Sequence, residues 1–215
     1  MQKPKAIIFD LDGVLTDTSE YHYQAWKHLA DDEGIPFTHE ENDAHLRGVG
    51  RRESLMYLIR GRHYSEDQIQ EMMDRKNRYY NDLIKQMSPK DVVPGGKDLL
   101  EEIRQAGIKS VIASASKNAR LVLDRLDITG YFDGVADGYC VVNSKPAPDI
   151  FVFAAGLVNV PTPDCLGIED AAAGVEAIKT AGMRAIGVGP QERFHNADKV
   201  LATFENKHLQ DLLDA

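Results

Sequence analysis

Two aspartates one residue apart, Asp10 and Asp12, follow a short apolar run near the start of the chain. The run Ala6–Phe9 predicts a buried parallel strand, and Asp10 would lie at its carboxyl end, where open α/β sheets build their sites. Two carboxylates this close repel each other unless a proton or a cation lies between them. The pair therefore indicates a metal site, although acids that follow a strand also occur in simple loops.

Three further polar groups follow or separate apolar runs later in the chain: Ser114, Lys145 and the pair Glu169-Asp170. Because strands of one direction end at one edge of a sheet, we expect these side chains to converge on Asp10. Carboxylate oxygens of Asp10, Glu169 and Asp170 would suit Mg²⁺. Lys145 can neutralise crowded carboxylates or a phosphate, and the Ser114 hydroxyl can donate to a phosphoryl oxygen. The grouping predicts a magnesium site that handles phosphate.

The elements that must position these groups alternate between short apolar strands and amphipathic helices from residue 95 onward, which is typical of a parallel sheet. We expect strands near 109–113, 134–136, 165–168, 185–188 and 200–202. A helical block interrupts this pattern directly after the first strand, with a basic loop at 47–52 and a helix from about residue 53. The sequence predicts a doubly wound parallel α/β core, residues 1–16 and 90–215, with an inserted helical cap domain, residues 17–89.

Composition narrows the class of protein. The formal net charge of −9 over 215 residues argues against a nucleic-acid surface and against an anionic membrane. The first apolar run is too short for a secretory signal, and no stretch approaches the roughly 20 apolar residues of a membrane helix. Cys140 and Cys165 have no metal or redox spacing, so we expect reduced thiols. We expect a cytoplasmic protein without nucleic-acid or membrane partners.

The motifs in this order resemble the haloacid dehalogenase-like superfamily of aspartate-nucleophile phosphotransferases, and Asp12 matches its phosphotransferring members, since the dehalogenases lack that acid. Over nearly the whole chain the sequence is similar to the β-phosphoglucomutase family. The segments that carry this similarity are Asp17-Thr18 with His22 and Trp26, Leu46-Arg47-Gly48-Val49 with Arg51 and Ser54, Arg75-Lys76-Asn77, Ser114-Ala115-Ser116-Lys117-Asn118, and Ser144-Lys145-Pro146-Ala147-Pro148-Asp149. Ala171 departs from the pattern, because we expect serine there in many mutases.

The resemblance implies a mechanism. Asp10 would be a nucleophile that carries a transient phosphoryl group, and Asp12 would be the general acid–base. Mg²⁺ would be held by Asp10, Glu169, Asp170 and the backbone carbonyl of Asp12. The implied reaction converts β-D-glucose 1-phosphate to glucose 6-phosphate through glucose 1,6-bisphosphate, so the expected partners are small sugar phosphates and the expected state is a monomer.

A substrate with two phosphates needs a second anion site away from the metal. Arg51 is the candidate, because its planar guanidinium can bind phosphate through two hydrogen bonds. Ser116, Lys117 and Asn118 form a core-side patch that could complete it. The other residues predicted to bind substrate are Thr18, His22, Trp26, Gly48, Val49, Ser54, Lys76, Ser114 and Lys145. Three alternatives stay open: Trp26 as packing inside the cap, Lys76 extended to the rim, and His22 on the surface.

Rival functions also stay open. A sugar-phosphate phosphatase of the same superfamily would use water for the second transfer. A phospho-aspartate signalling domain is a further alternative, although it needs neither the helical insert nor Glu169-Asp170. An inactive binding relative is disfavoured, because every catalytic motif position is filled.

Overall fold

A parallel six-stranded sheet forms the core of the protein, shown here by a computed structural model that describes residues 3–47 and 49–214. The strand order is β3-β2-β1-β4-β5-β6, and each neighbouring pair is parallel. The strands are β1 (Ala6–Phe9), β2 (Lys109–Ala113), β3 (Gly134–Ala136), β4 (Cys165–Glu169), β5 (Arg184–Val188) and β6 (Lys199–Leu201). The order reverses beside β1, which is where doubly wound sheets bind their ligands. The predicted fold class is confirmed.

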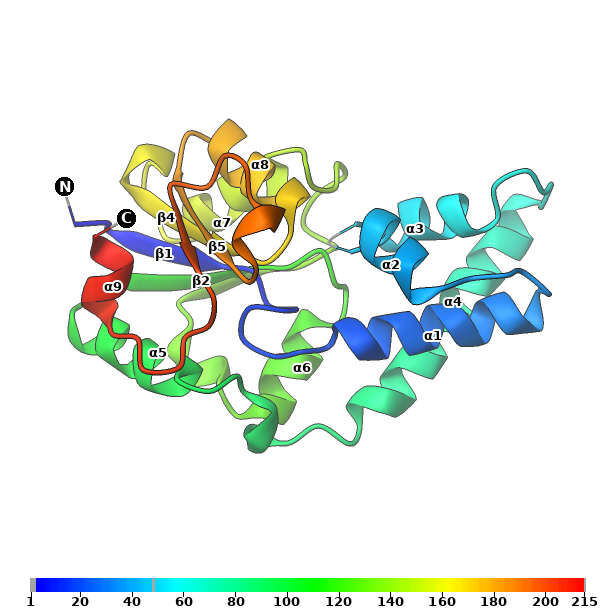
Figure 1. Cartoon of the computed structure of the whole chain (residues 1–215), viewed down its shortest axis with the longest axis horizontal. Helices are drawn as coiled ribbons and strands as arrows, with labels where there is room; N and C mark the ends of the chain where they lie inside the picture. Colours follow the sequence, from blue (N-terminus) through cyan, green and yellow to red (C-terminus); the bar gives the residue numbers. More distant parts are fainter. Residues whose placement is uncertain (1–2, 48, 215) are drawn as a thin grey trace.

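Helices cover both faces of the sheet (Figure 1). One face carries α5 (Gly96–Gln105), α6 (Ala119–Leu126) and α9 (Leu209–Leu213), and the other carries α7 (Asp149–Leu157) and α8 (Ala172–Thr180). Alternate β1 side chains enter the two layers: Ile7 and Phe9 join one apolar cluster, while Ala6 and Ile8 join the other. Burial on both faces explains why the first strand is an uninterrupted apolar run. Short 3₁₀ turns complete the core: η1 (Pro89–Asp91), η2 (Thr129–Tyr131), η3 (Thr162–Asp164) and η4 (Gln191–Arg193).

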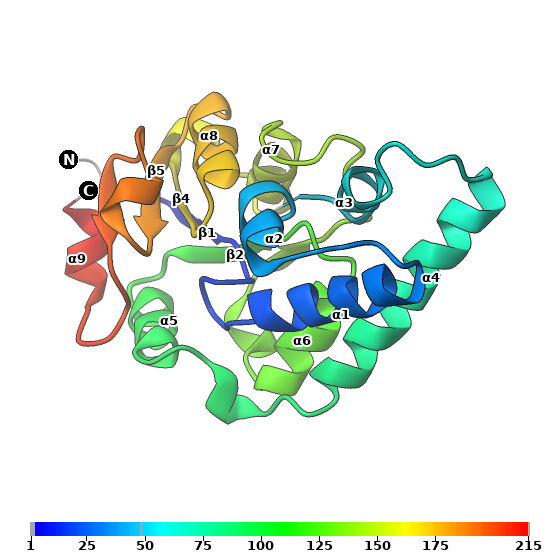
Figure 2. The same ribbon diagram turned by 45° about the vertical axis from the view of Figure 1, so that its right-hand side comes forward.

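Four helices inserted after β1 form the cap, which lies beside the carboxyl edge of the sheet (Figures 1 and 2). They are α1 (Ser19–Asp32), α2 (His39–His45), α3 (Arg51–Leu58) and α4 (Glu66–Ile84). The Ser65 hydroxyl and the Gln68 side chain form a capping box that begins α4. The cap has an apolar cluster of its own, which includes Trp26 and Leu55. None of the helices within residues 3–47 and 49–214 is both long and apolar enough to cross a membrane.

Two crossing segments join the cap to the core, and they are hydrogen-bonded to each other. The Thr16 hydroxyl donates to the Asp91 carbonyl over 2.8 Å, and the Val93 amide donates to the Leu15 carbonyl over 3.0 Å. The domain boundaries predicted at 16/17 and 89/90 stay predictions. The expected basic loop was too long, because α3 already begins at Arg51 behind an extended Gly50.

Candidate active site

Three carboxylates meet at the carboxyl ends of β1 and β4. Asp10 follows β1, Glu169 ends β4 and Asp170 comes next, and one oxygen of each lies within 4.8 Å of the others. Lys145, from the loop before α7, places its Nζ 2.6 Å from Asp10 Oδ1 and 2.6 Å from Glu169 Oε1. The other Glu169 oxygen accepts from the backbone amides of Asp170 and Ala171, both at 2.7 Å. The parallel topology thus assembles these buried groups as the spacing predicted.

Burial disfavours the ionised forms of Asp10 and Asp170 in this cluster. Burial, and next the Glu169 carboxylate, raises the pKa of Asp170 to about 7. Burial also raises the pKa of Asp10 well above its usual range, although the Lys145 ammonium opposes the change. Burial opposes the charged form of Lys145, but Asp10 and Glu169 outweigh it and raise the pKa of that ammonium. Another cation at the cluster would favour the ionised carboxylates.

Asp12 is held apart from the three carboxylates by its own set of contacts. The Thr18 hydroxyl donates to its Oδ1, and the Ser114 hydroxyl donates to its Oδ2 over 3.4 Å. His22 Nε2 lies 3.9 Å from the same Oδ2. Burial raises the pKa of Asp12 to about 6, against the opposing Lys145 charge. A carboxyl group with this pKa can give and accept a proton near neutral pH.

Two arginines contact Asp170, one at its side chain and the other at its backbone carbonyl. Arg47, in the segment between α2 and α3, places its Nε 2.7 Å from Asp170 Oδ2, and its terminal NH2 group contacts the same oxygen. Arg193 donates to the Asp170 backbone carbonyl over 2.9 Å. Gly13, at φ +82°, makes room for this arrangement, because a Cβ there would lie 2.2 Å from Asp170 Oδ2.

Charge balance at the cluster tests whether a metal ion fits. Three carboxylates, those of Asp10, Glu169 and Asp170, face the two cations that contact them, Lys145 and Arg47. One formal negative charge remains, so the cluster still attracts a cation. The hard carboxylate oxygens of this donor set suit such an ion.

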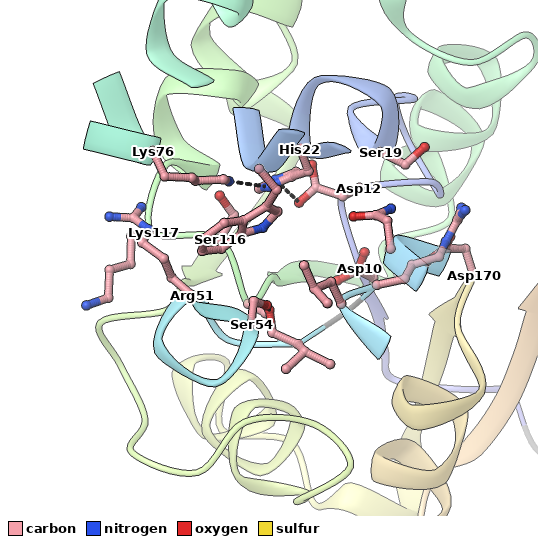
Figure 3. Close-up of a pocket in the computed structure, with 16 residues that line it drawn as sticks. Asp10, Asp12, Ser19, His22, Arg51, Ser54, Lys76, Ser116, Lys117 and Asp170 are labelled. Atoms are coloured by element: carbon pink, nitrogen blue, oxygen red, sulfur yellow. Dashed lines mark hydrogen bonds and ion pairs between the residues drawn. The ribbon is translucent and has the colours of Figure 1, made fainter. Parts of the chain in front are cut away.

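A cleft lies between the cap and these carboxylates (Figure 3). The space between its walls, with the open mouth included, is about 750 Å³. The predicted site residues that line it are Asp10, Asp12, His22, Trp26, Val49, Arg51, Ser54, Lys76, Ser116, Lys117 and Asp170. The predicted residues Thr18, Ser114, Asn118, Lys145 and Glu169 instead contact the cleft residues or one another. Gly48 lies outside the described residues.

Lys76, which is buried, and His22, which is half-buried, form a pair in the cap wall of the cleft. Lys76 Nζ lies 3.0 Å from His22 Nδ1 and 4.8 Å from the centre of the Trp26 ring. Burial, and next the nearby Arg51 charge, lowers the pKa of Lys76 well below its usual value. Burial, with Lys76 second, likewise lowers the pKa of His22. The alternative that placed Lys76 at the rim is wrong, because Lys76 is only 3% exposed. The His22 side chain is 28% exposed and lines the cleft. Trp26 both packs inside the cap and lines the cleft.

The far end of the cleft is cationic. Arg51 donates to Asn77 Oδ1 over 2.8 Å, and Asn118 of the core donates to the same oxygen, also over 2.8 Å. Lys117 Nζ lies 4.9 Å from the centre of the Tyr139 ring. Within the described part of the chain, neither Arg51 nor Lys117 has a carboxylate partner. The cleft therefore joins a carboxylate end to an end with two uncompensated cations.

The sequence missed several cleft residues. Ser19, Asn42, Leu46, Arg47 and Ala115 also line it. Arg47 and Leu46 stood in the cap segment on which the family resemblance rested, and Ala115 stood between Ser114 and Ser116. Ser19 and Asn42 carried no signal, because both read as ordinary polar positions at the start and middle of surface helices.

Comparison with known proteins agrees with this geometry. The model of the haloacid dehalogenase-like hydrolase family matches residues 4–182. The chain belongs to this family. A β-phosphoglucomutase of Bacillus subtilis is 46% identical over 201 residues, covering 92% of this chain and 88% of that protein. A phosphorylated carbohydrates phosphatase of Thermotoga maritima is 32% identical, covering 85% of this chain and 83% of that protein.

A solved structure is similar throughout its length. The crystal structure of a β-phosphoglucomutase from Clostridium difficile superposes with a TM-score of 0.95 at 39% identity, covering 98% of this chain and 96% of that one. The resemblance predicted from the motifs is therefore confirmed. The chain is an enzyme of this phosphomutase and phosphatase family, with an acidic cluster that could hold a metal ion.

Proposed function

We propose that this enzyme is a β-phosphoglucomutase, which interconverts β-D-glucose 1-phosphate and glucose 6-phosphate through glucose 1,6-bisphosphate. The observation that carries the proposal is the pair of cations, Arg51 and Lys117, that face the cleft without carboxylate partners in the described residues. A substrate with one phosphate at the carboxylate end and another at the cationic end matches this distribution of charge. The identity of 46% to the Bacillus subtilis mutase supports the same reading.

The cation of the site is proposed to be Mg²⁺. The carboxylates of Asp10, Glu169 and Asp170, with the backbone carbonyl of Asp12, would hold it. When bound, the ion would offset negative charge on the phosphoryl oxygens. Ala171 lacks the hydroxyl expected at its position, but its backbone amide still orients Glu169.

Asp10 is the proposed nucleophile. Its carboxylate would attack the phosphorus atom of the bound phosphate and carry the phosphoryl group as an acyl phosphate. Lys145, only 2.6 Å from Asp10, would orient the attacking carboxylate and offset the charge that develops on the transferred group. The Ser114 hydroxyl, which donates to Asp12 in this structure, would contribute a hydrogen bond when a phosphoryl group is present.

Asp12 is the proposed general acid–base. In one half-reaction it would protonate the departing sugar oxygen, and in the other it would take the proton of the attacking sugar hydroxyl. Thr18 and His22 would orient it, since the Thr18 hydroxyl donates to one oxygen of its carboxyl group and His22 Nε2 lies 3.9 Å from the other.

The remaining predicted residues surround the sugar and its second phosphate. Arg51 and Lys117 would bind the phosphate that is not reacting, together with Ser116 and Asn118. Trp26, Val49, Ser54 and Lys76 would shape the wall against which the sugar lies. Gly48 is proposed for the same wall on the resemblance alone.

A sugar-phosphate phosphatase is the second candidate, and the 32% identical Thermotoga maritima phosphatase favours it. In that case water would take the phosphoryl group from Asp10. Products distinguish the two functions: the enzyme is supplied with β-glucose 1-phosphate, Mg²⁺ and a trace of glucose 1,6-bisphosphate, and glucose 6-phosphate is quantified against free phosphate. A mutase yields mainly glucose 6-phosphate. Free phosphate as the main product would replace the proposal with the phosphatase.

The aspartyl phosphate has its own test. A labelled phosphoryl donor should mark Asp10 by mass spectrometry, and Asp10→Asn should take up no label while keeping its fold. Label on another residue would refute the proposed nucleophile. Sugar phosphates as partners, a monomeric state and a cytoplasmic location stay predictions.

A further inference from the structure

A cation of the cap lies on a proposed metal ligand of the core. The Arg47 Nε is 2.7 Å from Asp170 Oδ2, and the side chain of Asp170 is 4% exposed. Other cap arginines behave differently: Arg60 pairs with Glu41, and Arg52 pairs with Glu66, inside the cap. A movement of the cap would therefore change the distance between the Arg47 charge and the carboxylate cluster.

The charge of Arg47 matters because it neutralises part of the negative charge of the carboxylate cluster. With Arg47 in contact, the three carboxylates of Asp10, Glu169 and Asp170 and the two cations leave one negative charge. With the cap withdrawn, Lys145 alone offsets the three carboxylates, and two negative charges face an incoming ion. A divalent cation is therefore attracted more strongly when Arg47 is away, and the bound ion in turn repels the guanidinium.

We propose that Arg47 is a positioning residue that couples cap closure to the charge at Asp170. The coupling rests on the proposed Mg²⁺ site. Mg²⁺ weakens the Arg47–Asp170 contact and shifts the cap towards the open state, which admits substrate. A phosphoryl group on or beside Asp10 adds negative charge, restores the balance and shifts the cap towards the closed state. Because binding and closure are linked, each must change the other by the same factor.

The test measures Mg²⁺ affinity by calorimetry, with Mg²⁺ alone as the probe and the full-length protein at fixed ionic strength. Arg47→Gln removes the charge and Arg47→Lys keeps it. Arg60→Gln is the matched control, because it removes an arginine whose ion pair, with Glu41, lies within the cap. Arg47→Gln should bind Mg²⁺ about 5- to 20-fold more tightly than the wild type, within the usual range of coupling between sites. The other two variants should bind like the wild type.

Small-angle X-ray scattering gives a readout of cap position that does not depend on activity. Mg²⁺ alone should increase the radius of gyration of the wild type, and added glucose 1,6-bisphosphate should reverse the increase. In Arg47→Gln, Mg²⁺ alone should leave the radius unchanged.

The outcomes separate this inference from the proposed function. Equal or weaker Mg²⁺ affinity in Arg47→Gln, with a wild type that binds Mg²⁺, overturns the coupling and leaves the metal site standing. A wild type that binds no Mg²⁺ overturns both. Circular dichroism of each variant establishes that the fold is kept, and Arg47→Lys supplies a second comparison at the same position.

Discussion

Replacing Arg51 by glutamine should change which product the enzyme makes. The substitution keeps a long polar side chain and removes the charge proposed to bind the non-reacting phosphate. Arg51 is half-buried, and among the described residues its terminal nitrogen donates to the neutral Asn77 oxygen and to no carboxylate, so its charge is available to a phosphate. Transfer of the phosphoryl group from Asp10 to water needs no second phosphate. The mutase rate should therefore fall while the hydrolysis of phosphorylated Asp10 hardly changes.

The size of the loss follows from the contacts that the guanidinium can make. Each hydrogen bond to a charged group contributes about 1.5–3 kcal/mol, and a half-buried fork making two of them is screened in part by solvent. A total of about 2–4 kcal/mol corresponds to a loss of about 30- to 700-fold in kcat/KM for the mutase reaction, since about 1.4 kcal/mol is tenfold.

The assay measures glucose 6-phosphate and free phosphate in the same reaction, started with β-glucose 1-phosphate, Mg²⁺ and glucose 1,6-bisphosphate. Arg52→Gln is the matched control, because the neighbouring side chain is exposed and pairs with Glu66. If both products fall equally in Arg51→Gln, Arg51 supports the structure of the cap instead. If neither falls, the second anion site lies elsewhere, with Lys117 and Lys76 the next candidates.

Three other substitutions test the site. Lys145→Met should lower the free energy of unfolding by about 3–5 kcal/mol in urea titrations, because it leaves two buried carboxylates without their shared cation. Asp12→Asn should slow turnover of β-glucose 1-phosphate by about 10²-fold or more in steady-state assays, with little change in Mg²⁺ affinity by calorimetry, because the proposed metal contact of Asp12 is its carbonyl. Lys76→Met should raise the melting temperature, because it replaces a buried charge, and should lower kcat.

Each substitution has an outcome that contradicts its reasoning. An unfolding free energy within about 1 kcal/mol of the wild type would mean that Lys145 contributes less than a buried ion pair normally does. Near-normal turnover in Asp12→Asn would exclude Asp12 as the acid–base. A lower melting temperature in Lys76→Met would mean that the contacts of its ammonium with His22 and Trp26 outweigh the cost of burying it.

The core-side half of the site could be predicted because parallel topology alone brings it together. Asp10 and Glu169-Asp170 each stand where an apolar run ends, and neighbouring β1 and β4 then place them side by side. The Lys145 contact was also within reach, since a lysine between crowded carboxylates has an obvious partner. What the sequence did not show was that Ser114 and Thr18 would both donate to Asp12, because that depends on how the loop after β1 turns.

The cap-side half could not be predicted to the same depth, because it depends on the angle at which the cap meets the core. Lys76 fell on the apolar stripe of α4, and only the packed structure shows whether such a lysine reaches solvent or stays buried. Arg47 belongs to a segment that carried the family resemblance. The residues around it do not predict that it contacts Asp170, which is 123 residues away in the sequence.

The position of Asn77 shows how these two halves are joined. One residue further along α4 than Lys76, it points about 100° around the helix, so that one side chain enters the cap wall while the next reaches the core. Its oxygen accepts from Arg51 of the cap and from Asn118 of the core, each over 2.8 Å. At the cleft, this neutral bridge and the Arg47–Asp170 pair connect cap to core through polar side chains, while Ala25, Tyr80 and Ile84 of the cap helices pack into the apolar cluster beside β1. The polar contacts exchange readily for water, which would let the cleft side of the cap open and close as a lid over a phosphoryl-transfer site.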